Sequence, residues 1–191
     1  REQVDFSAQN VSVPLNGSID EILSHCRLSD LVVIQQAAPY DDFHQELIRG
    51  LVFDSAAPIL IVPCNVVERQ FERAVIAWDG RSVTAHAVQS ALPLLELAQA
   101  IGIVSVVREG EAAHDASDLS RHLGRHGIRA VGRAISMERS VATTLLRYIA
   151  DQGIDWVVMG GFGHGRIHEL IHGSPTIDML RASTVPILMH R

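Results

Sequence analysis

The stretch that decides the fold reads WVVMGGFGHG and covers residues 156–165. Its first four residues are apolar and two of them are β-branched, which is typical of a buried strand. The glycines that follow are typical of a tight turn, because glycine adopts backbone angles that other residues avoid. A buried strand that ends in a glycine turn, with a helix start at Ser174 beyond it, predicts an α/β unit.

Outward from this stretch, apolar runs and helical patterns alternate along residues 73–191. The expected strands are the apolar or β-branched runs at 74–78, 101–107, 128–135, 156–159 and 185–189. The expected helices between them are 82–99, 114–126, 140–150 and 174–182. Pro93 lies inside the first of these helices and is expected to kink it. Five strands that alternate with four helices predict an open five-stranded parallel sheet covered on both faces.

Residues 1–67 repeat the second half of this pattern. Three elements correspond in order, namely a helix start at Gly17-Ser18 with one at Ser140, SDLVVI at 29–34 with IDWVVM at 154–159, and SAAPIL at 55–60 with STVPIL at 183–188. Three similar elements in the same order indicate a duplication. We therefore expect two domains in tandem. The first, at 1–67, is incomplete, with its opening strands upstream of Arg1, and the second, at 68–191, is complete.

The composition of the 191 residues excludes several kinds of site. All 16 residues counted as Lys or Arg are arginine, so the chain has no phosphate-loop lysine, Schiff-base lysine or lysine general base. The formal net charge of −6 supplies no bulk attraction to nucleic acid or to an anionic membrane. Cys26 and Cys64 lack a metal-ligand spacing, and no apolar run is long enough to span a membrane. We therefore expect a cytoplasmic protein with no nucleic-acid or membrane partner.

The glycines at 160, 163 and 173 stand in a pattern that suits an anion. They form Gly160-x2-Gly163-x9-Gly173-Ser174, directly after a strand and ending at a helix start. Backbone N–H groups of such a turn and of a helix N-terminus bind phosphates, and glycine lets the backbone approach the ligand closely. On these grounds alone the turn is either structural or a phosphate site.

This spacing resembles, without a gap, the nucleotide-binding signature of the universal stress protein family. Asp79-Gly80, at the end of the first strand of the complete domain, and the closing strand STVPIL at 183–188 resemble the family as well. The resemblance implies a Rossmann-like fold, of the adenine nucleotide alpha hydrolase type, with strand order 3-2-1-4-5. It also implies that Asp79 and Gly160 face each other across the crevice in which such sheets bind ligands.

The resemblance further implies a site for ATP or another adenine nucleotide, with Mg. Ala77 and Asp79 would lie by adenine and ribose, and Val106 would line the base. The phosphates would be held by Gly160, Gly163, Gly173 and Ser174, with Met159 and Pro175 beside them. Two residues depart from the family pattern: Arg81 stands where many members have serine, and Pro175 lacks an amide at the helix start. The corresponding turn of the first half, at 35–39, has no glycine, so we expect a single site.

A second motif, HELIH at 168–172, has the HExxH spacing of zinc peptidases. The extended form of that motif needs glycine at 175 and histidine at 178, where the chain has Pro175 and Asp178. We therefore expect no peptidase and no dedicated metal site. His164, His168 and His172 share one helix face, so metal binding there stays open as an alternative, as does a solvated face.

The function expected from the residues and the resemblance is an ATP-binding regulatory module of the stress response. Hydrolysis is expected to be slow at most, because no general base or arginine finger can be assigned. Without lysine, the phosphate charge falls to amides, Ser174, arginine and a divalent ion, so binding should depend on Mg. The alternative is a nucleotide-free protein-interaction module.

The closing strands of the two halves, at 57–62 and 185–189, carry an expectation about assembly. In the implied order each lies at a sheet edge, where unpaired backbone groups invite a partner. We therefore expect the two halves to pair with each other as an internal pseudo-dimer, whose outer surface forms a further homodimer.

Overall fold

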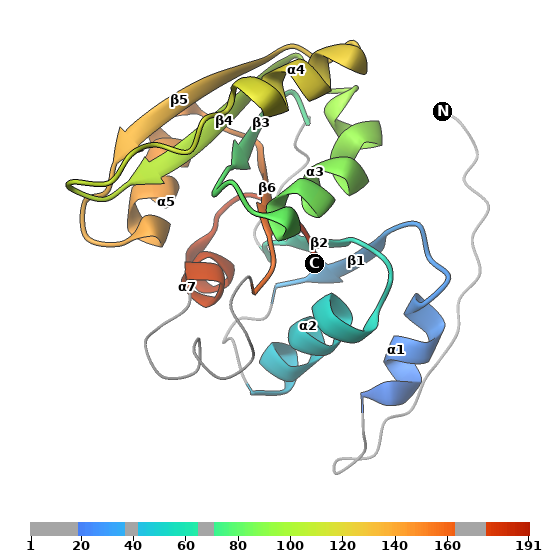
Figure 1. Cartoon of the computed structure of the whole chain (residues 1–191). Helices are drawn as coiled ribbons and strands as arrows, with labels where there is room; N and C mark the ends of the chain where they lie inside the picture. The colour runs from blue at the N-terminus through green and yellow to red at the C-terminus, as the bar shows by residue number, and fades with distance from the viewer. Residues whose placement is uncertain (1–18, 37–41, 65–70, 163–174) are drawn as a thin grey trace.

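A computed structural model of the chain describes residues 19–36, 42–64, 71–162 and 175–191, and these residues form one α/β unit. Strands and helices alternate along it, as the sequence predicts (Figure 1). In the first half the elements are α1 (Asp20–Cys26), β1 (Val32–Gln35), α2 (Asp42–Asp54) and β2 (Ile59–Val62). In the second half they are β3 (Arg73–Ala77), α3 (Ser82–Leu95), β4 (Ala100–Val107), α4 (Ser117–Arg125), β5 (Ala130–Ser136), α5 (Val141–Gln152), β6 (Trp156–Gly160), α7 (Pro175–Ala182) and β7 (Ile187–His190).

The strands form a single seven-stranded sheet in the order β1-β2-β7-β6-β3-β4-β5. Counted from β3, the second half has the order 3-2-1-4-5, so the expected order is confirmed there. The expectation of a five-stranded sheet is corrected, because β1 and β2 extend the same sheet beyond β7. Every neighbouring pair is parallel except β2 and β7, which run antiparallel with Ile61 opposite Ile187. The closing strands of the two halves therefore pair within one chain, while a pseudo-twofold relation between two whole domains stays a prediction.

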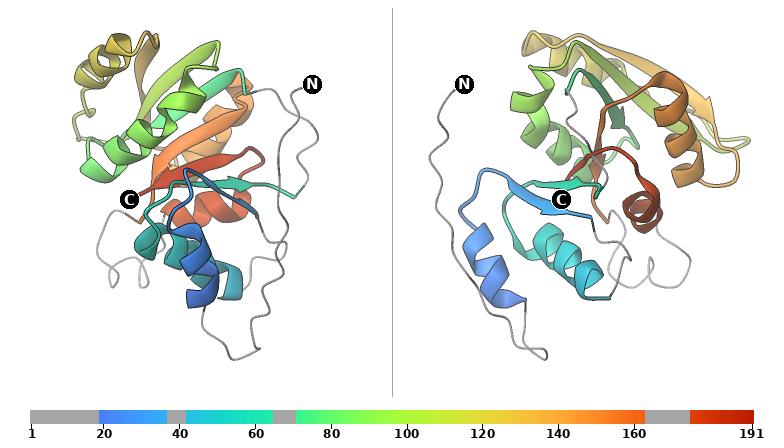
Figure 2. Two further views of the ribbon diagram at one scale, coloured as in Figure 1. Left: turned by 90° about the vertical axis from the view of Figure 1, so that its right-hand side faces the viewer. Right: turned by 180° about the vertical axis from the view of Figure 1, so that it is seen from behind.

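Two layers of helices cover the two faces of the sheet (Figure 2). Helices α3 and α4 pack on one face, and α1, α2, α5 and α7 pack on the other. Side chains along β6 alternate between the two faces. Trp156 and Val158 point into the core cluster on the face of α3 and α4, and Val157 and Met159 point into the core cluster on the face of α1, α2, α5 and α7. A strand that buries both faces must be apolar at every position, as its sequence predicts.

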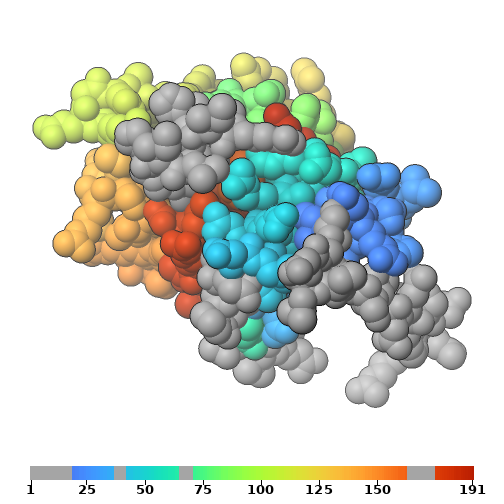
Figure 3. Space-filling view, turned by 90° about the horizontal axis from the view of Figure 1, so that it is seen from below, coloured from blue at the N-terminus to red at the C-terminus, as the bar shows by residue number. Residues whose placement is uncertain are grey.

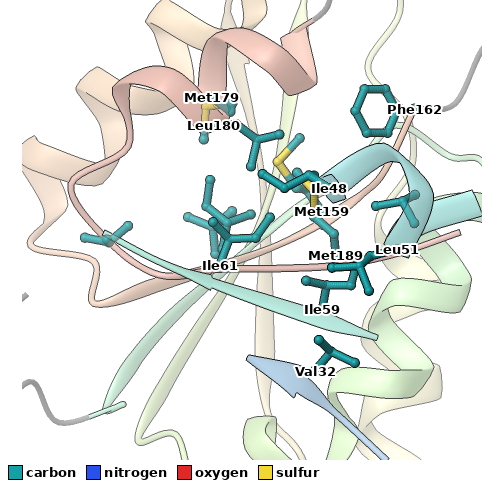
Figure 4. Close-up of a cluster of buried hydrophobic side chains, with 14 of the residues drawn as sticks. Val32, Ile48, Leu51, Ile59, Ile61, Met159, Phe162, Met179, Leu180 and Met189 are labelled. Carbon is teal, nitrogen blue, oxygen red and sulfur yellow. The ribbon is translucent and has the colours of Figure 1, made fainter. Parts of the chain in front are cut away.

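The core cluster on the face of α1, α2, α5 and α7 joins the two halves of the chain. Ile48 and Leu51 of α2 lie with Met179 and Leu180 of α7, and Met159 packs among them (Figure 4). From below, α2 and α7 lie side by side on the surface of the molecule (Figure 3). The seam between the halves is therefore a shared hydrophobic core rather than a surface contact.

Helix α3 ends earlier than its pattern predicts. The pattern extends to residue 99, but the helix ends at Leu95 with Pro93 in its last turn. Gln99 and Ala100 instead donate their N–H groups to the carbonyl of Glu72, at 2.8 and 3.0 Å. These hydrogen bonds place the start of β4 beside the start of β3, so the helix cannot continue to residue 99.

Helix α5 has the cap that the sequence predicts. The hydroxyl of Ser140 accepts a hydrogen bond from the N–H of Thr143 at 3.1 Å. At the other end Gly153 adopts a left-handed conformation with φ of 59°, which a glycine tolerates and other residues resist. These two residues fix the length of the helix that leads into β6.

Candidate functional site

The strand order reverses at β3, and the candidate site lies at this point. Strand β3 has β4 on one side and β6 on the other, so that Ala77 is paired with Val104 and with Met159. The connections from β3 and from β6 leave to opposite faces of the sheet, because α3 covers one face and α7 the other. The carboxyl ends of such strands bound a crevice in which α/β sheets bind ligands.

Asp79 follows β3 at the crevice and is held by the start of α3. Its Oδ1 accepts hydrogen bonds from the hydroxyl of Thr84 at 2.6 Å and from the N–H of Arg81 at 3.1 Å. Its Oδ2 lies 3.9 Å from Nε of Arg81, and 46% of the side chain is exposed. The carboxylate is therefore fixed in orientation and still within reach of a ligand. The departure at Arg81 puts a guanidinium beside this carboxylate.

Gly160, at the end of β6, packs against the start of α3. From the sequence we expect its missing side chain to let a ligand approach the backbone closely, and this expectation stays a prediction. In the structure a Cβ at this position would lie 2.9 Å from both the backbone N and the hydroxyl of Thr84, and 3.0 Å from Val83. Glycine is thus required here by the close approach of α3, and this approach brings the end of β6 against the helix that holds Asp79.

Gly161 and Phe162 tie the start of the glycine segment to the first half of the chain. A Cβ on Gly161 would lie 2.9 Å from Val52 of α2. Phe162 is only 5% exposed and its ring centroid lies 5.6 Å from that of Phe53. Its φ of +46° is unusual for a residue with a side chain and is retained because the ring is buried. Sequence reasoning missed this anchor, and the signal was the single large apolar residue among the glycines.

The other predicted site residues divide into those that the structure describes and those that it does not. Ala77 and Val106 are partly buried against the core cluster on the face of α1, α2, α5 and α7, and Met159 is buried in that cluster. Pro175 is exposed and is the first residue of α7. Gly163, Gly173 and Ser174 lie outside the described residues. The structure therefore brings Ala77, Asp79, Met159 and Gly160 to the ends of two neighbouring strands and leaves the phosphate part of the prediction untested.

The metal alternatives also fall largely outside what the structure describes. His164, His168 and His172 lie in the segment that is not described, together with the whole of HELIH. Within residues 19–36, 42–64, 71–162 and 175–191, no three His, Cys, Asp or Glu side chains are grouped as metal ligands. In the same ranges, none of the helices combines the length and the apolar character needed to cross a membrane.

The loop between β4 and α4 folds back toward the crevice, which the sequence did not predict. The indole N–H of Trp78 donates to the carbonyl of Asp115 at 3.2 Å, and the hydroxyl of Ser105 donates to the carbonyl of His114 at 3.3 Å. A Cβ on Gly80, whose φ is +72°, would lie 2.8 Å from the ring of His114. Hydrogen bonds from the side chain and N–H of Ser117 hold the pKa of Asp115 below its usual value. His114 therefore borders the Asp79-Gly80 turn instead of standing alone on the surface.

Comparison with known proteins identifies the family of the C-terminal part of the chain. The family model described as "Universal stress protein family" matches residues 124–191, which contain β5, α5, β6, α7 and β7. Residues 124–191 belong to the universal stress protein family. The matched part includes Gly160 and the segment that follows it, but not Asp79.

Individual universal stress proteins are similar to more of the chain than residues 124–191. Universal stress protein Slr1230 of Synechocystis sp. is 28% identical over an alignment of 136 residues, which covers 68% of this chain and 47% of that protein. The chain thus spans about half the length of this curated relative. A universal stress protein from Archaeoglobus fulgidus DSM 4304 has a TM-score of 0.72 at 20% identity, over 91% of this chain and 64% of that one. A universal stress protein solved in complex with cAMP has a TM-score of 0.49 at 15% identity, over 64% of this chain and 99% of that one. The first of these structures shows the same fold.

A second polar cluster lies where α3 meets β7. The hydroxyl of Ser90 is 2.7 Å from Nδ1 of His190. Burial, together with the neighbouring charge of His86, lowers the pKa of His190, and a hydrogen bond with the backbone of Ala56 opposes this shift. Ser90 is partly buried on the face of α3 that meets β7. We therefore read it as a structural contact between the second half and the Ala56 turn of the first.

Proposed function

We propose that this chain is a regulatory module that binds an adenine nucleotide in the crevice between the ends of β3 and β6. The observation that carries the proposal is the position of Asp79, a fixed and accessible carboxylate at the point where the strand order reverses. Ala77, Val106 and Met159 supply apolar surface beside it. The family membership of residues 124–191 supports the same assignment.

The proposed contacts follow the chemistry of each group. A carboxylate accepts hydrogen bonds, so Asp79 is assigned to a hydroxyl of the ribose, and the apolar side chains at 77 and 106 are assigned to the base. Gly160, Gly163, Gly173, Ser174 and Pro175 are assigned to the phosphate end, as the signature spacing implies. In the absence of lysine, Mg is assigned to the remaining phosphate charge.

The test is a calorimetric titration with ATP and MgCl2 of the wild type, Asp79→Asn and Asp155→Asn. Asp79→Asn keeps an oxygen that can accept from Arg81 and Thr84 and removes only the charge. A hydrogen bond to a charged group contributes about 1.5–3 kcal/mol, so this variant should bind at least about tenfold more weakly. Asp155 is the matched control, because its carboxylate accepts from the N–H of Arg73 at 2.8 Å at the opposite end of the same two strands.

Each outcome of the titration has a separate meaning. Folded wild-type protein that gives no heat with ATP would overturn the proposal and leave the nucleotide-free interaction module in its place. Equal affinities of the two asparagine variants would reject the assignment of Asp79. Unchanged affinity after chelation of Mg with EDTA would reject the metal.

Further parts of the proposal concern activity, location and assembly. Hydrolysis of the bound nucleotide is at most slow, because no described residue at the crevice is placed as a general base for an attacking water. The chain acts in the cytoplasm and joins its two halves as a pseudo-dimer through β2 and β7, with further dimerisation through an outer surface. Sedimentation equilibrium checks that last part directly.

A further inference from the structure

Strand β5 ends the sheet on the side away from the first half and is open to solvent. It is the outermost strand at the upper left of Figure 1. Five of its seven residues are exposed, and 73% of Val131 is accessible. A strand of this length at a sheet edge presents unpaired backbone groups to any extended chain that lies beside it.

The direction of the β5 backbone groups follows from one hydrogen bond. The N–H of Met137 donates to the carbonyl of Val107 of β4 at 2.7 Å. In a parallel pair, alternate residues direct both their N–H and their C=O to the same neighbour. Residues 131, 133 and 135 therefore bond to β4, and Gly132, Ala134 and Ser136 direct their backbone groups to the open edge.

A pocket of about 520 Å³ lies against this edge. It is lined by residues 113–117, by Ser120 and by residues 132–134. Position 132 has no room for a side chain, because a Cβ on Gly132 would lie 2.8 Å from the Cβ of Ala116. Gly132 and Ala134 thus border the pocket with their side-chain positions and face the open edge with their backbone groups. A chain paired with β5 would direct alternate side chains into the pocket.

The charges around β5 are not balanced. Of the acids near β5, Glu111, Asp118 and Glu138 are each paired with an arginine, namely Arg108, Arg121 and Arg147. Asp115, which lines the pocket, accepts a hydrogen bond from the N–H of Ser117 at 2.8 Å and interacts electrostatically with Arg121. Arg129 and Arg133 are exposed, and neither has an ion pair with any residue that the structure describes. The edge therefore carries positive charge on a chain whose formal net charge is −6. Opposite charges on facing strands stabilise a pair, and like charges destabilise it.

The charge also decides against a second copy of the chain. Antiparallel pairing of β5 with itself over its full length sets Arg133 opposite Arg133 of the other copy. Such a contact is repulsive. The positive edge suits an acidic strand, and β5 itself contains no acidic residue.

We infer that the open edge of β5 and its neighbouring pocket bind an extended acidic peptide segment of a partner protein by strand addition. Backbone hydrogen bonds to Gly132, Ala134 and Ser136 supply affinity. An acidic residue opposite Arg133 and a short side chain in the pocket supply selectivity. The strand edge of this site is separate from the crevice, because β4 lies between β5 and β3. The pocket shares His114 with the surroundings of the Asp79-Gly80 turn.

The test uses a fluorescein-labelled nine-residue peptide, Ser-Thr-Val-Thr-Glu-Thr-Val-Thr-Ser, whose binding is measured by fluorescence anisotropy. A second peptide replaces the glutamate by lysine, and a third carries N-methyl groups on alternate amides, so that it keeps its side chains and cannot complete the strand pairing. Wild-type protein should bind the glutamate peptide about fivefold more tightly than the lysine peptide and should not bind the methylated one. Arg133→Glu should reverse the preference between the first two, and Arg139→Glu, beyond the end of β5, is the matched control.

Chemical-shift mapping on 15N-labelled protein locates the contact. Amides of residues 132, 134 and 136 should shift on titration, and those of Ala77 and Gly160 should not. The inference is overturned by the absence of binding to wild-type protein at 1 mM peptide, by equal binding of the methylated peptide, or by a preference that Arg133→Glu leaves unchanged. Concentration-dependent dimerisation through β5 would replace the peptide by a second copy and would overturn it as well.

Discussion

Ile61 and Ile187 are opposite each other in the antiparallel pair that joins the two halves, and both are almost fully buried. If the halves share one core, these two side chains must contribute jointly to stability. Replacing a buried isoleucine by alanine costs about 2–5 kcal/mol, because apolar contacts are lost and a cavity remains. Each single variant is therefore expected to lose an amount in this range.

The coupling between the two replacements is the informative quantity. When both side chains are removed, the second removal enlarges a cavity that the first has already made, so the combined loss should be smaller than the sum by about 0.5–3 kcal/mol. Ile61 with Ile103 is the control pair. Ile103 is fully buried in the other core cluster, four strand positions away, or about 19 Å. Its coupling with Ile61 should be below about 0.5 kcal/mol.

Urea unfolding followed by tryptophan emission and by far-UV circular dichroism gives all the required free energies. If the double alanine variant does not fold, the corresponding valine variants, which cost about 0.5–1.5 kcal/mol each, report the same cycle. A coupling for Ile61 and Ile187 that equals the control, or two separate unfolding transitions, would refute a common core.

Three further outcomes are expected. Ser140→Ala should lower the free energy of unfolding by about 1 kcal/mol in urea titrations, because the N–H of Thr143 loses its acceptor, whereas Ser140→Gly should cost only a few tenths. His190, whose pKa is lowered in the folded state, contributes stability that is present above the usual histidine pKa and lost as the pH falls below it. Urea midpoints between pH 7 and pH 5 should therefore fall less steeply in His190→Gln than in the wild type, and equal slopes would contradict this. Gly160→Ala should destabilise the fold by about 1–3 kcal/mol, since its Cβ meets the backbone of Thr84, and a melting temperature equal to that of the wild type would show that α3 can move aside.

The sequence predicted the parts of the fold that depend on local pattern. The apolar run at 156–159 and the Ser140 cap could be predicted because each depends on neighbours within a few residues. The order of the strands came through the resemblance, since periodicity does not state which strands are adjacent. That β1 and β2 join the same sheet depends on one antiparallel pair between distant segments, which no local signal specifies.

The candidate site was predictable to a similar depth. Asp79 stands out as an acid directly after a buried strand, and its position at the crevice follows from the strand order. Its contact with Thr84 and the packing of Gly160 against the same helix depend on how closely α3 approaches β6, which is a property of the packed molecule. Phe162 was missed because a lone aromatic residue in a glycine run does not state what it will pack against.

The position of β7 has a consequence for how the molecule assembles. Strands β2 and β6 each complete their pairing only when β7 lies between them. More than half of the chain separates Ile61 of β2 from Ile187 of β7. Contacts between such distant segments form late, because a long loop must close before they can contribute. Until then two apolar strand edges are exposed in the same molecule, and a neighbouring chain can supply the missing strand. Refolding at high concentration should therefore yield exchanged dimers at the expense of monomers, in a proportion that falls on dilution.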